Sequence, residues 1–382
     1  MKTYVRTETV SRAGGCGLSG KQILLASLIG AAACLCAPMR ATADHDHYQQ
    51  LNLVSDQAGV AILQDTNLVN SWGMSFSSKS PFWISDNGRG LATLYAVTND
   101  SQGMLHVSKV GLEVTIPGDG SATGQFFNTL SASGAFHGDL FIFVNEDGTI
   151  SGWRQALGTA AEVLVPGITN NVYKGTTLVT NSSSGPVLLA ANFRAGTVDV
   201  YGTNSVLTNQ LADASVPAGY APFNVQVVGD LVFVTYAKQD EFKHDDVAGK
   251  GNGLIDVLNP MTWMFHRFAT GKNAGGKVKQ IDSPWGVALA PKSFGAHGDQ
   301  LLVGNFGSGT IMVFDEHGDF KDFIEGAHEK PIVIDGLWAL AFGNGGSAGM
   351  PDQLFFTAGP NHESDGLFGR ITPLETKHDG KK

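Results

Sequence analysis

The chain has 382 residues, of which only 16% are charged, and its formal net charge at neutral pH is −10. An acidic chain is a poor candidate for binding nucleic acid or anionic lipid, because both need clustered lysine and arginine. The 49 glycines and the many short apolar runs predict an all-β protein rich in turns.

Residues 1–43 have the features of a secretory signal peptide. Basic residues such as Lys2 and Arg6 precede the apolar run 23–33, which is too short to span a bilayer, and residues 41–43 (ATA) offer a cleavage site. Residues 31–34 (AAAC) weakly resemble a lipoprotein cleavage box, so lipidation of Cys34 is the lesser alternative. We expect export to the periplasm or the extracellular space, with no membrane span in the mature chain.

All three cysteines lie inside this segment, so the mature chain has no disulfide. Its 339 residues include 20 basic and 34 acidic side chains, a net charge of −14. The mature chain must therefore be stabilised by its core, by bound ions or by the geometry of its fold.

A glycine followed by alternating apolar and small residues recurs six times in the mature chain. The six glycines are Gly90, Gly148, Gly196, Gly253, Gly309 and Gly366, at successive spacings of 58, 48, 57, 56 and 57 residues. The most similar copies, 192–202 (NFRAGTVDVYG) and 305–315 (NFGSGTIMVFD), lie two units apart. Regular repetition at this spacing is typical of a β-propeller; a β-sandwich would lack it, and a β-helix has shorter repeats.

Each signature follows a second apolar run and a turn, which predicts a β-hairpin. Four hairpins are preceded by a short strand with an aromatic residue near its start: Trp72, Phe223, Trp285 and Trp338. Unit two lacks this feature around residues 125–136. We expect the three tryptophans to be core anchors between adjacent blades rather than a platform for stacking sugars, and a more variable fourth strand to complete each unit.

The sequence therefore predicts one all-β domain over residues 44–375, a six-bladed β-propeller. The strand 48–54 has no hairpin of its own, so we expect it to pair into the last blade and close the ring, which removes the open sheet edges. Residues 376–382 form a charged C-terminal tail. We expect a monomer.

With these units, the chain resembles an uncharacterised family of exported bacterial propeller proteins distantly related to the NHL-repeat group. The motifs that carry the resemblance are NSWGM from Asn70, the loop from Tyr236 to Gly253, SPWGVA from Ser283, and the paired NFxxGT segments. The resemblance covers nearly the whole mature chain. It implies a six-bladed propeller and export, and it implies no activity.

Oxygen-bearing side chains are predicted at one mouth of the central channel, which is the natural concavity of a propeller. The candidate ligand-binding residues there are Asn70, Asp86, Asn87, Asn145, Asn192, Asn224, Asp282, Asn305, Asp335 and Asn361. A ring of such oxygens suits Ca²⁺. The alternative is structural, because Asn and Asp also tolerate left-handed turns and cap their own backbone.

The turn of unit four is replaced by the long loop 238–253. Its carboxylates Asp240, Asp245 and Asp246 are candidate Ca²⁺ ligands, although their spacing does not match the calcium-loop pattern. The alternative is a solvated acidic loop.

The sequence contains no serine-nucleophile elbow, zinc-protease motif or phosphate loop, so no catalytic residue is assigned. The first hypothesis is a binding or scaffold module for an extracytoplasmic small molecule or protein. The alternative is a cation-dependent hydrolase of lactones or small esters, with ligands or base drawn from Asp86, Asn145, Asn192, Asn224, Asp282 and Asp335. The hydrolase requires these side chains to converge at the channel mouth.

Overall fold

The computed structural model describes residues 47–271 and 280–374, which belong to one compact unit running from His45 to Lys382. The predicted signal peptide, residues 1–43, and the predicted tail, residues 376–382, lie outside the described residues. No helix among the described residues is long and apolar enough to cross a membrane.

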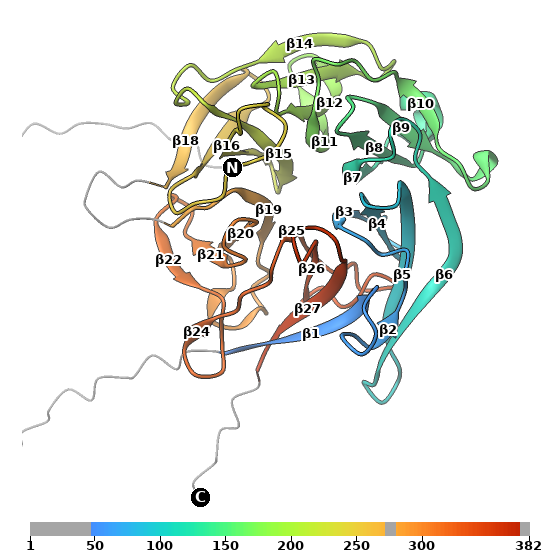
Figure 1. Ribbon diagram of the computed structural model, residues 1–382, viewed down its shortest axis with the longest axis vertical. Coiled ribbons are helices and arrows are strands. Elements are labelled where there is room, and N and C mark those ends of the chain that lie inside the picture. Colours follow the sequence, from blue (N-terminus) through green and yellow to red (C-terminus); the bar gives the residue numbers. More distant parts are fainter. Residues whose placement is uncertain (1–46, 272–279, 375–382) are drawn as a thin grey trace, which may run out of the picture. The chain divides into compact units, whose positions relative to one another are not determined.

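Six antiparallel sheets surround one axis, which confirms the predicted six-bladed propeller (Figure 1). In the first five blades, four strands follow one another in chain order from the axis to the rim. Blade 1 contains β3 (Ser71–Ser75), β4 (Phe82–Asp86), β5 (Leu91–Asn99) and β6 (Leu105–Thr115); blade 2 contains β7 (Ala122–Phe127), β8 (Phe141–Asn145), β9 (Ile150–Trp153) and β10 (Glu162–Val165). Blade 3 contains β11 (Tyr173–Ser182), β12 (Gly185–Asn192), β13 (Thr197–Gly202) and β14 (Leu207–Leu211); blade 4 contains β15 (Tyr220–Val228), β16 (Leu231–Lys238), β17 (Gly253–Asn259) and β18 (Met264–Thr270). Blade 5 contains β19 (Pro284–Leu289), β20 (Leu301–Asn305), β21 (Ile311–Phe314) and β22 (Phe320–Phe323).

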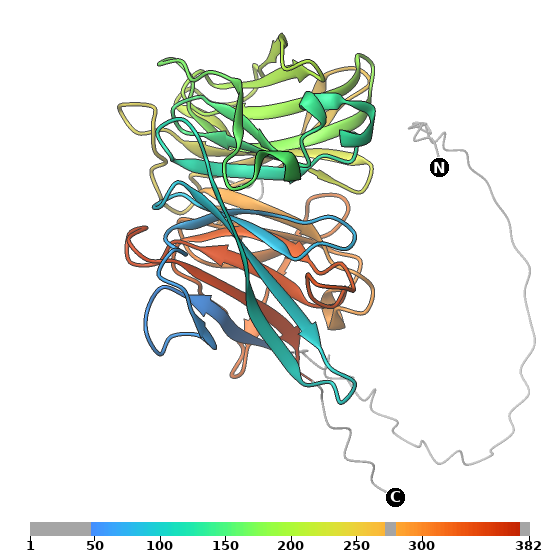
Figure 2. The ribbon, with the colours of Figure 1, turned by 90° about the vertical axis from the view of Figure 1, so that its right-hand side faces the viewer.

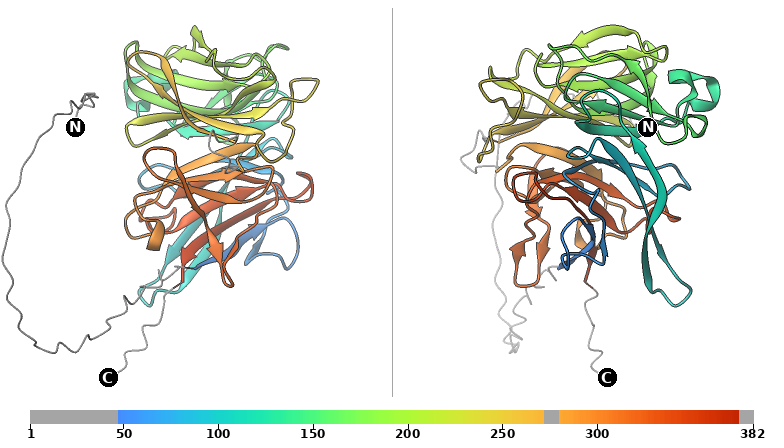
Figure 3. Two further views of the ribbon diagram at one scale, coloured as in Figure 1. Left: turned by 90° about the vertical axis from the view of Figure 1, so that its left-hand side faces the viewer. Right: turned by 45° about the vertical axis from the view of Figure 1, so that its right-hand side comes forward.

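The N-terminal strand closes the ring, as predicted. Blade 6 contains β25 (Leu337–Phe342), β26 (Leu354–Ala358) and β27 (Leu367–Pro373), followed by β1 (Tyr48–Ser55) and the short β2 (Leu63–Gln64). β1 pairs antiparallel with β27 from Tyr48 opposite Pro373 to Ser55 opposite Leu367, and Figures 2 and 3 show the two strands side by side. The Tyr48 hydroxyl also donates to the Phe294 carbonyl of blade 5 at 3.0 Å, so the closing strand ties two blades together.

Short elements outside the blades connect their strands. They are the 3₁₀ turns Ser131–Ser133, Ala135–Gly138, Gln155–Leu157 and Gly295–His297, and the small hairpin of β23 (Glu325–Gly326) and β24 (Lys330–Pro331).

The strands are apolar on both faces because each blade packs between two others. In β12, Val187 and Leu189 contribute to the core between blades 3 and 4, whereas Leu188 and Ala190 contribute to the core toward blade 2. This two-sided burial explains why the sequence shows nearly continuous apolar runs as well as alternation.

The inner strands approach one another closely at a ring of glycines. A Cβ added to Gly124 would lie 2.7 Å from the Gly175 Cα of the next blade, and one added to Gly286 would lie 2.6 Å from the Trp338 carbonyl oxygen. Gly73 and Gly175 meet their neighbouring blades in the same way. The Trp-Gly pairs that the sequence repeats are therefore needed for the inner strands to fit around the axis.

Aromatic residues near the starts of the inner strands meet at the axis itself. Trp338 stacks on Trp72 at a centroid distance of 3.6 Å and on Phe306 at 3.9 Å, and Trp285 meets it edge-on at 6.1 Å. Phe223 belongs to the same buried cluster. The three tryptophans were predicted to anchor adjacent blades; together with Phe223 and Phe306 they form one shared layer across the channel.

Gly124→Ala should destabilise the fold by about 1–3 kcal/mol, because the new methyl group would force two inner strands apart. The free energy of unfolding from urea denaturation measures this. Gly111→Ala in β6 is the matched control, since nothing lies within 4 Å of its added Cβ. Equal stability of the two variants would contradict the role assigned to the glycine ring.

Candidate functional site

A buried lysine occupies the axial position of blade 3 where four other blades carry an aromatic residue. Lys174 precedes Gly175 as Trp72 precedes Gly73, and it is 1% exposed. Its ammonium lies 5.1 Å from the centroid of the Trp72 ring, and its carbonyl accepts a hydrogen bond from Trp285 Nε1 at 3.1 Å. Lys174 is therefore held inside the aromatic layer by its backbone and by its ring contact.

Two carboxylates compensate the buried charge. Lys174 Nζ donates to Glu146 Oε1, from the turn between β8 and β9, and to Asp245 Oδ1 at 3.1 Å, from the long loop of blade 4. Burial alone would lower the pKa of Lys174, but the charges of Glu146 and Asp245 raise it above its ordinary value. The side chain is therefore a permanent ammonium at the channel mouth.

An amide network extends from this ion pair across the mouth. Asn87 Nδ2 donates to Glu146 Oε2 at 3.1 Å, and Asn70 Nδ2 donates to Asn87 Oδ1 at 3.2 Å and to Glu363 Oε2 at 2.7 Å. Trp338 Nε1 donates to Asn70 Oδ1 at 3.0 Å. Of the ten predicted mouth residues, Asn70 and Asn87 are thus brought together with this ion pair.

Glu363 reaches the mouth from a strained turn between β26 and β27. Asn361, His362 and Glu363 all have left-handed backbone conformations, with φ of 55°, 56° and 64°. Non-glycine residues adopt this conformation at a cost, and such strain concentrates at functional sites. Burial raises the pKa of the Glu363 carboxyl.

Four other predicted residues form hydrogen bonds within their own blade or to the connection that enters it. Asp86 accepts from Thr93 Oγ1 at 2.7 Å inside blade 1, and burial raises its pKa. Asn145 donates to the Pro117 carbonyl at 2.7 Å. The remaining two are Asn192, which donates to Asp199 and accepts from the Ala195 amide, and Asn305, which accepts from the Asp282 amide.

The last four predicted residues are likewise scattered. Asp282 Oδ1 accepts from the Gly249 amide at 2.6 Å, and burial raises its pKa. Asp335 is exposed and accepts from the Asn361 amide, while the Asn361 side chain donates to Asp365. Asn224 donates to the Trp285 carbonyl at 2.9 Å and lines the lower channel. The six residues proposed for the hydrolase are not brought together.

The three carboxylates predicted to bind Ca²⁺ also have different roles. Asp245 pairs with Lys174, and Asp240 Oδ1 accepts from the His244 amide at 2.8 Å. Asp246 Oδ2 is buried and lacks a hydrogen-bond partner in the described part of the chain, and burial raises the pKa of Asp246 from 3.8 to about 6.

A different set of side chains has the spacing of metal ligands. Oxygen and nitrogen atoms of Glu146, His244 and Asp245 lie within 4.8 Å of one another, the one such group among the described residues. Lys174 Nζ already donates to two of the three. The ammonium therefore stands where a divalent cation would bind.

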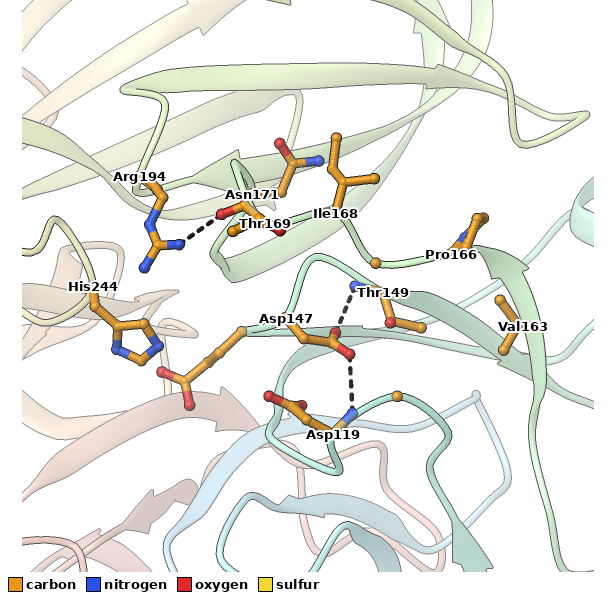
Figure 4. Close-up of a pocket in the computed structure, with 13 residues that line it drawn as sticks. Asp119, Asp147, Thr149, Val163, Pro166, Ile168, Thr169, Asn171, Arg194 and His244 are labelled. Atoms are coloured by element: carbon orange, nitrogen blue, oxygen red, sulfur yellow. Dashed lines mark hydrogen bonds between the residues drawn. The ribbon is translucent and has the colours of Figure 1, made fainter.

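A cleft of about 560 Å³ opens beside this network (Figure 4). It is lined by Gly118, Asp119, Glu146, Asp147, Thr149, Val163, Pro166, Gly167, Ile168, Thr169, Asn171, Arg194 and His244. Glu146 and His244 thus belong both to the mouth network and to the cleft wall. A second cavity of about 300 Å³, lined by the six inner strands, lies on the far side of the aromatic layer.

The sequence analysis missed Lys174, Asp119 and Arg194, although the repeats carried a signal for two of them. YKGT of unit three aligns with the SWGM and PWGV segments, which places Lys174 at an aromatic position. In the paired NFxxG segments, Arg194 stands where the fifth unit has Gly307. A charged residue that replaces the repeat consensus at the mouth was the available clue.

No family model matches the chain. It is 28% identical over 342 residues to uncharacterized protein R648 of Acanthamoeba polyphaga mimivirus, covering 84% of this chain and 78% of the relative. It is 25% identical over 338 residues to uncharacterized protein L690 of the same virus, covering 84% of each chain. The names of these two relatives state no activity.

Solved propellers share the architecture. A Bacteroides thetaiotaomicron protein of unknown function superposes with a TM-score of 0.51 at 9% identity, covering 86% of this chain and 76% of that chain. An auxiliary nutrient binding protein from Bacteroides ovatus gives 0.50 at 10% identity, covering 86% and 78%. A streptogramin B lyase gives 0.49 at 10% identity, covering 86% and 98%. This likeness shows the fold alone, and membership of the exported bacterial family stays a prediction.

Asp246→Asn should flatten the pH dependence of stability. Because the folded-state pKa of about 6 lies above 3.8, the folded chain holds a proton that the unfolded chain has lost between these values. Lowering the solution from about pH 7 to about pH 5 therefore stabilises the wild type through this group. The difference in unfolding free energy between wild type and variant, followed from about pH 7 to about pH 5, measures the contribution of Asp246. A difference that stays constant over this range would contradict the raised pKa of Asp246.

Lys174→Met should convert the mouth into a cation site, because Glu146, His244 and Asp245 lose their internal ammonium. We expect the variant to be less stable by about 3 kcal/mol in EDTA, since an unpaired carboxylate stays buried. Added Ca²⁺ or Zn²⁺ should raise its melting temperature by binding the native state.

The wild type and Lys321→Met, which removes an exposed lysine paired with Asp315, are the controls. A rise of the same size in all three proteins would show that Lys174 does not occupy the cation position.

Proposed function

We propose that this chain is an exported binding module that takes a small polar ligand in the cleft beside the channel mouth. The cleft volume of about 560 Å³ falls within the usual range of ligand pockets. Two of the lining residues, Glu146 and His244, are held by the Lys174 network, so this wall of the cleft is formed before the ligand arrives. Preorganisation of this kind lowers the entropic cost of binding.

The observation that carries the proposal is the state of Arg194. Its Nη1 donates to the Thr169 carbonyl at 2.6 Å, while its Nε is buried without a hydrogen-bond partner. Within residues 47–271 and 280–374, no carboxylate lies at ion-pair distance from it. Because Nε is buried, the terminal nitrogens are the donors that can reach a ligand. Guanidinium nitrogens form strong charged hydrogen bonds with carboxylates, so we infer that an anionic group of the ligand binds them.

The hydrolase alternative has no comparable support. Lactone hydrolysis by a bound cation needs a carboxylate beside a held metal ion. The proposed ligands Asp86, Asn145 and Asn192 form their hydrogen bonds at three different blades, and two members of the metal-like cluster already accept from Lys174. Binding requires only the shape and the charges of the cleft.

Export rests on the sequence of residues 1–43, and we propose a periplasmic or extracellular location for the mature monomer. The net charge of −14 on the mature chain keeps it soluble and disfavours binding to nucleic acid.

Benzoate is a suitable probe because it combines one carboxylate with an apolar ring. Arg194→Gln should weaken its binding by about tenfold or more, since charged hydrogen bonds are lost. Titration calorimetry on the mature chain, residues 44–382, measures the dissociation constant.

Arg89→Gln is the matched control, because Arg89 also donates to a backbone carbonyl, that of Thr66, but does not line the cleft. Equal binding of benzoate by the two variants would contradict the proposal.

A further inference from the structure

We propose that the ligand of this cleft is a small zwitterion with an apolar middle, such as a dipeptide with free termini. This inference rests on the proposed function, because it names the ligand class of the same cleft. Its carboxylate binds Arg194, its ammonium faces Asp119 and Asp147, and its apolar part covers Val163 and Ile168.

The acidic side of the cleft lacks a cation. Asp147 Oδ1 accepts from the Thr149 amide at 2.8 Å and its Oδ2 accepts from the Asp119 amide at 2.9 Å, so this carboxylate is held in one orientation. Asp119 Oδ1 accepts from the Ser121 amide at 2.9 Å. Neither aspartate forms an ion pair with any described residue.

Opposite charges thus line one cleft without neutralising each other. Arg194 and the two aspartates all face the same space, and they lie on different sides of it in Figure 4. Glu146, the third carboxylate of the cleft, is already neutralised by Lys174. The unpaired groups are therefore one guanidinium and a pair of carboxylates, separated by the width of the cleft.

An apolar wall completes the site. Val163 and Ile168 are 47% and 56% exposed, and Pro166 lies between them. Exposed apolar side chains inside a cleft mark a place where a ligand removes them from water. Val163, Pro166 and Ile168 therefore suit an apolar side chain of the ligand better than a polar part of its backbone.

The charge pattern distinguishes a zwitterion from ligands of a single charge. An anion alone would leave Asp119 and Asp147 unpaired and would meet the negative potential of the chain, whereas a cation alone would leave Arg194 unpaired. A zwitterion pairs both poles and carries no net charge. Complementary charges of this kind contribute mainly to specificity.

Leucyl-leucine, its N-acetylated form and its C-terminal amide test this proposal by titration calorimetry on the mature chain. The free dipeptide should bind about tenfold more tightly than either capped form, because each cap removes one charged contact. Asp119→Asn combined with Asp147→Asn should weaken the free dipeptide and leave the acetylated form unchanged. Arg194→Gln should weaken the free and acetylated forms and leave the amide unchanged.

Asp119→Asn keeps the oxygen that accepts from the Ser121 amide, whereas Asp147→Asn keeps only one of the two hydrogen bonds that Asp147 accepts. The unfolding free energy of the double variant is therefore measured beside its binding, and the unchanged affinity for the acetylated form shows that the cleft is intact. Asp352→Asn, an exposed change outside the cleft, is the control and should bind as the wild type does. If the acetylated dipeptide binds as tightly as the free one, the zwitterion proposal is overturned while binding through Arg194 stands. If neither dipeptide nor benzoate binds, the proposed function itself fails.

Discussion

Six sheets can share an axis only if their inner strands approach closely and the enclosed space is filled. The glycine ring meets the first requirement, and the aromatic layer around Trp338 meets the second. Because Trp338 contacts rings from blades 1, 4 and 5, the layer links sheets that are not neighbours in sequence. The layer also divides the channel into a charged mouth and a lower cavity, so a ligand at the mouth is separated from the lower cavity.

The buried lysine then determines how the mouth is arranged. A charge in an apolar layer is tolerated only with close counter-charges, and Lys174 takes them from Glu146 and Asp245. Pairing with Asp245 draws the long loop of blade 4 over the axis, which places His244 on the cleft wall. One wall of the cleft is therefore linked to the neutralisation of Lys174.

The fold could be predicted from the sequence because the same local pattern occurs once in each of the six blades. Glycine spacing gave the blade number, and an unpartnered strand at 48–54 gave the closure. The roles of the residues at the mouth were harder to predict, because Asn and Asp occur both in turns and in binding sites. Asn192 caps its turn, whereas Asn70 joins a hydrogen-bond network through Glu363, which is far away in sequence. That Arg194 forms no ion pair with a described residue is a property of the assembled blades, and no local pattern could reveal it.

The antiparallel closure has a mechanical consequence. Tyr48 at the start of β1 lies opposite Pro373 at the end of β27, so a force applied to both ends of the folded chain acts at one end of this pair. Its backbone hydrogen bonds would then be loaded one after another, as in a zipper, and not all together in shear. The seam that removes the open sheet edges is therefore the place where the ring would open first under tension.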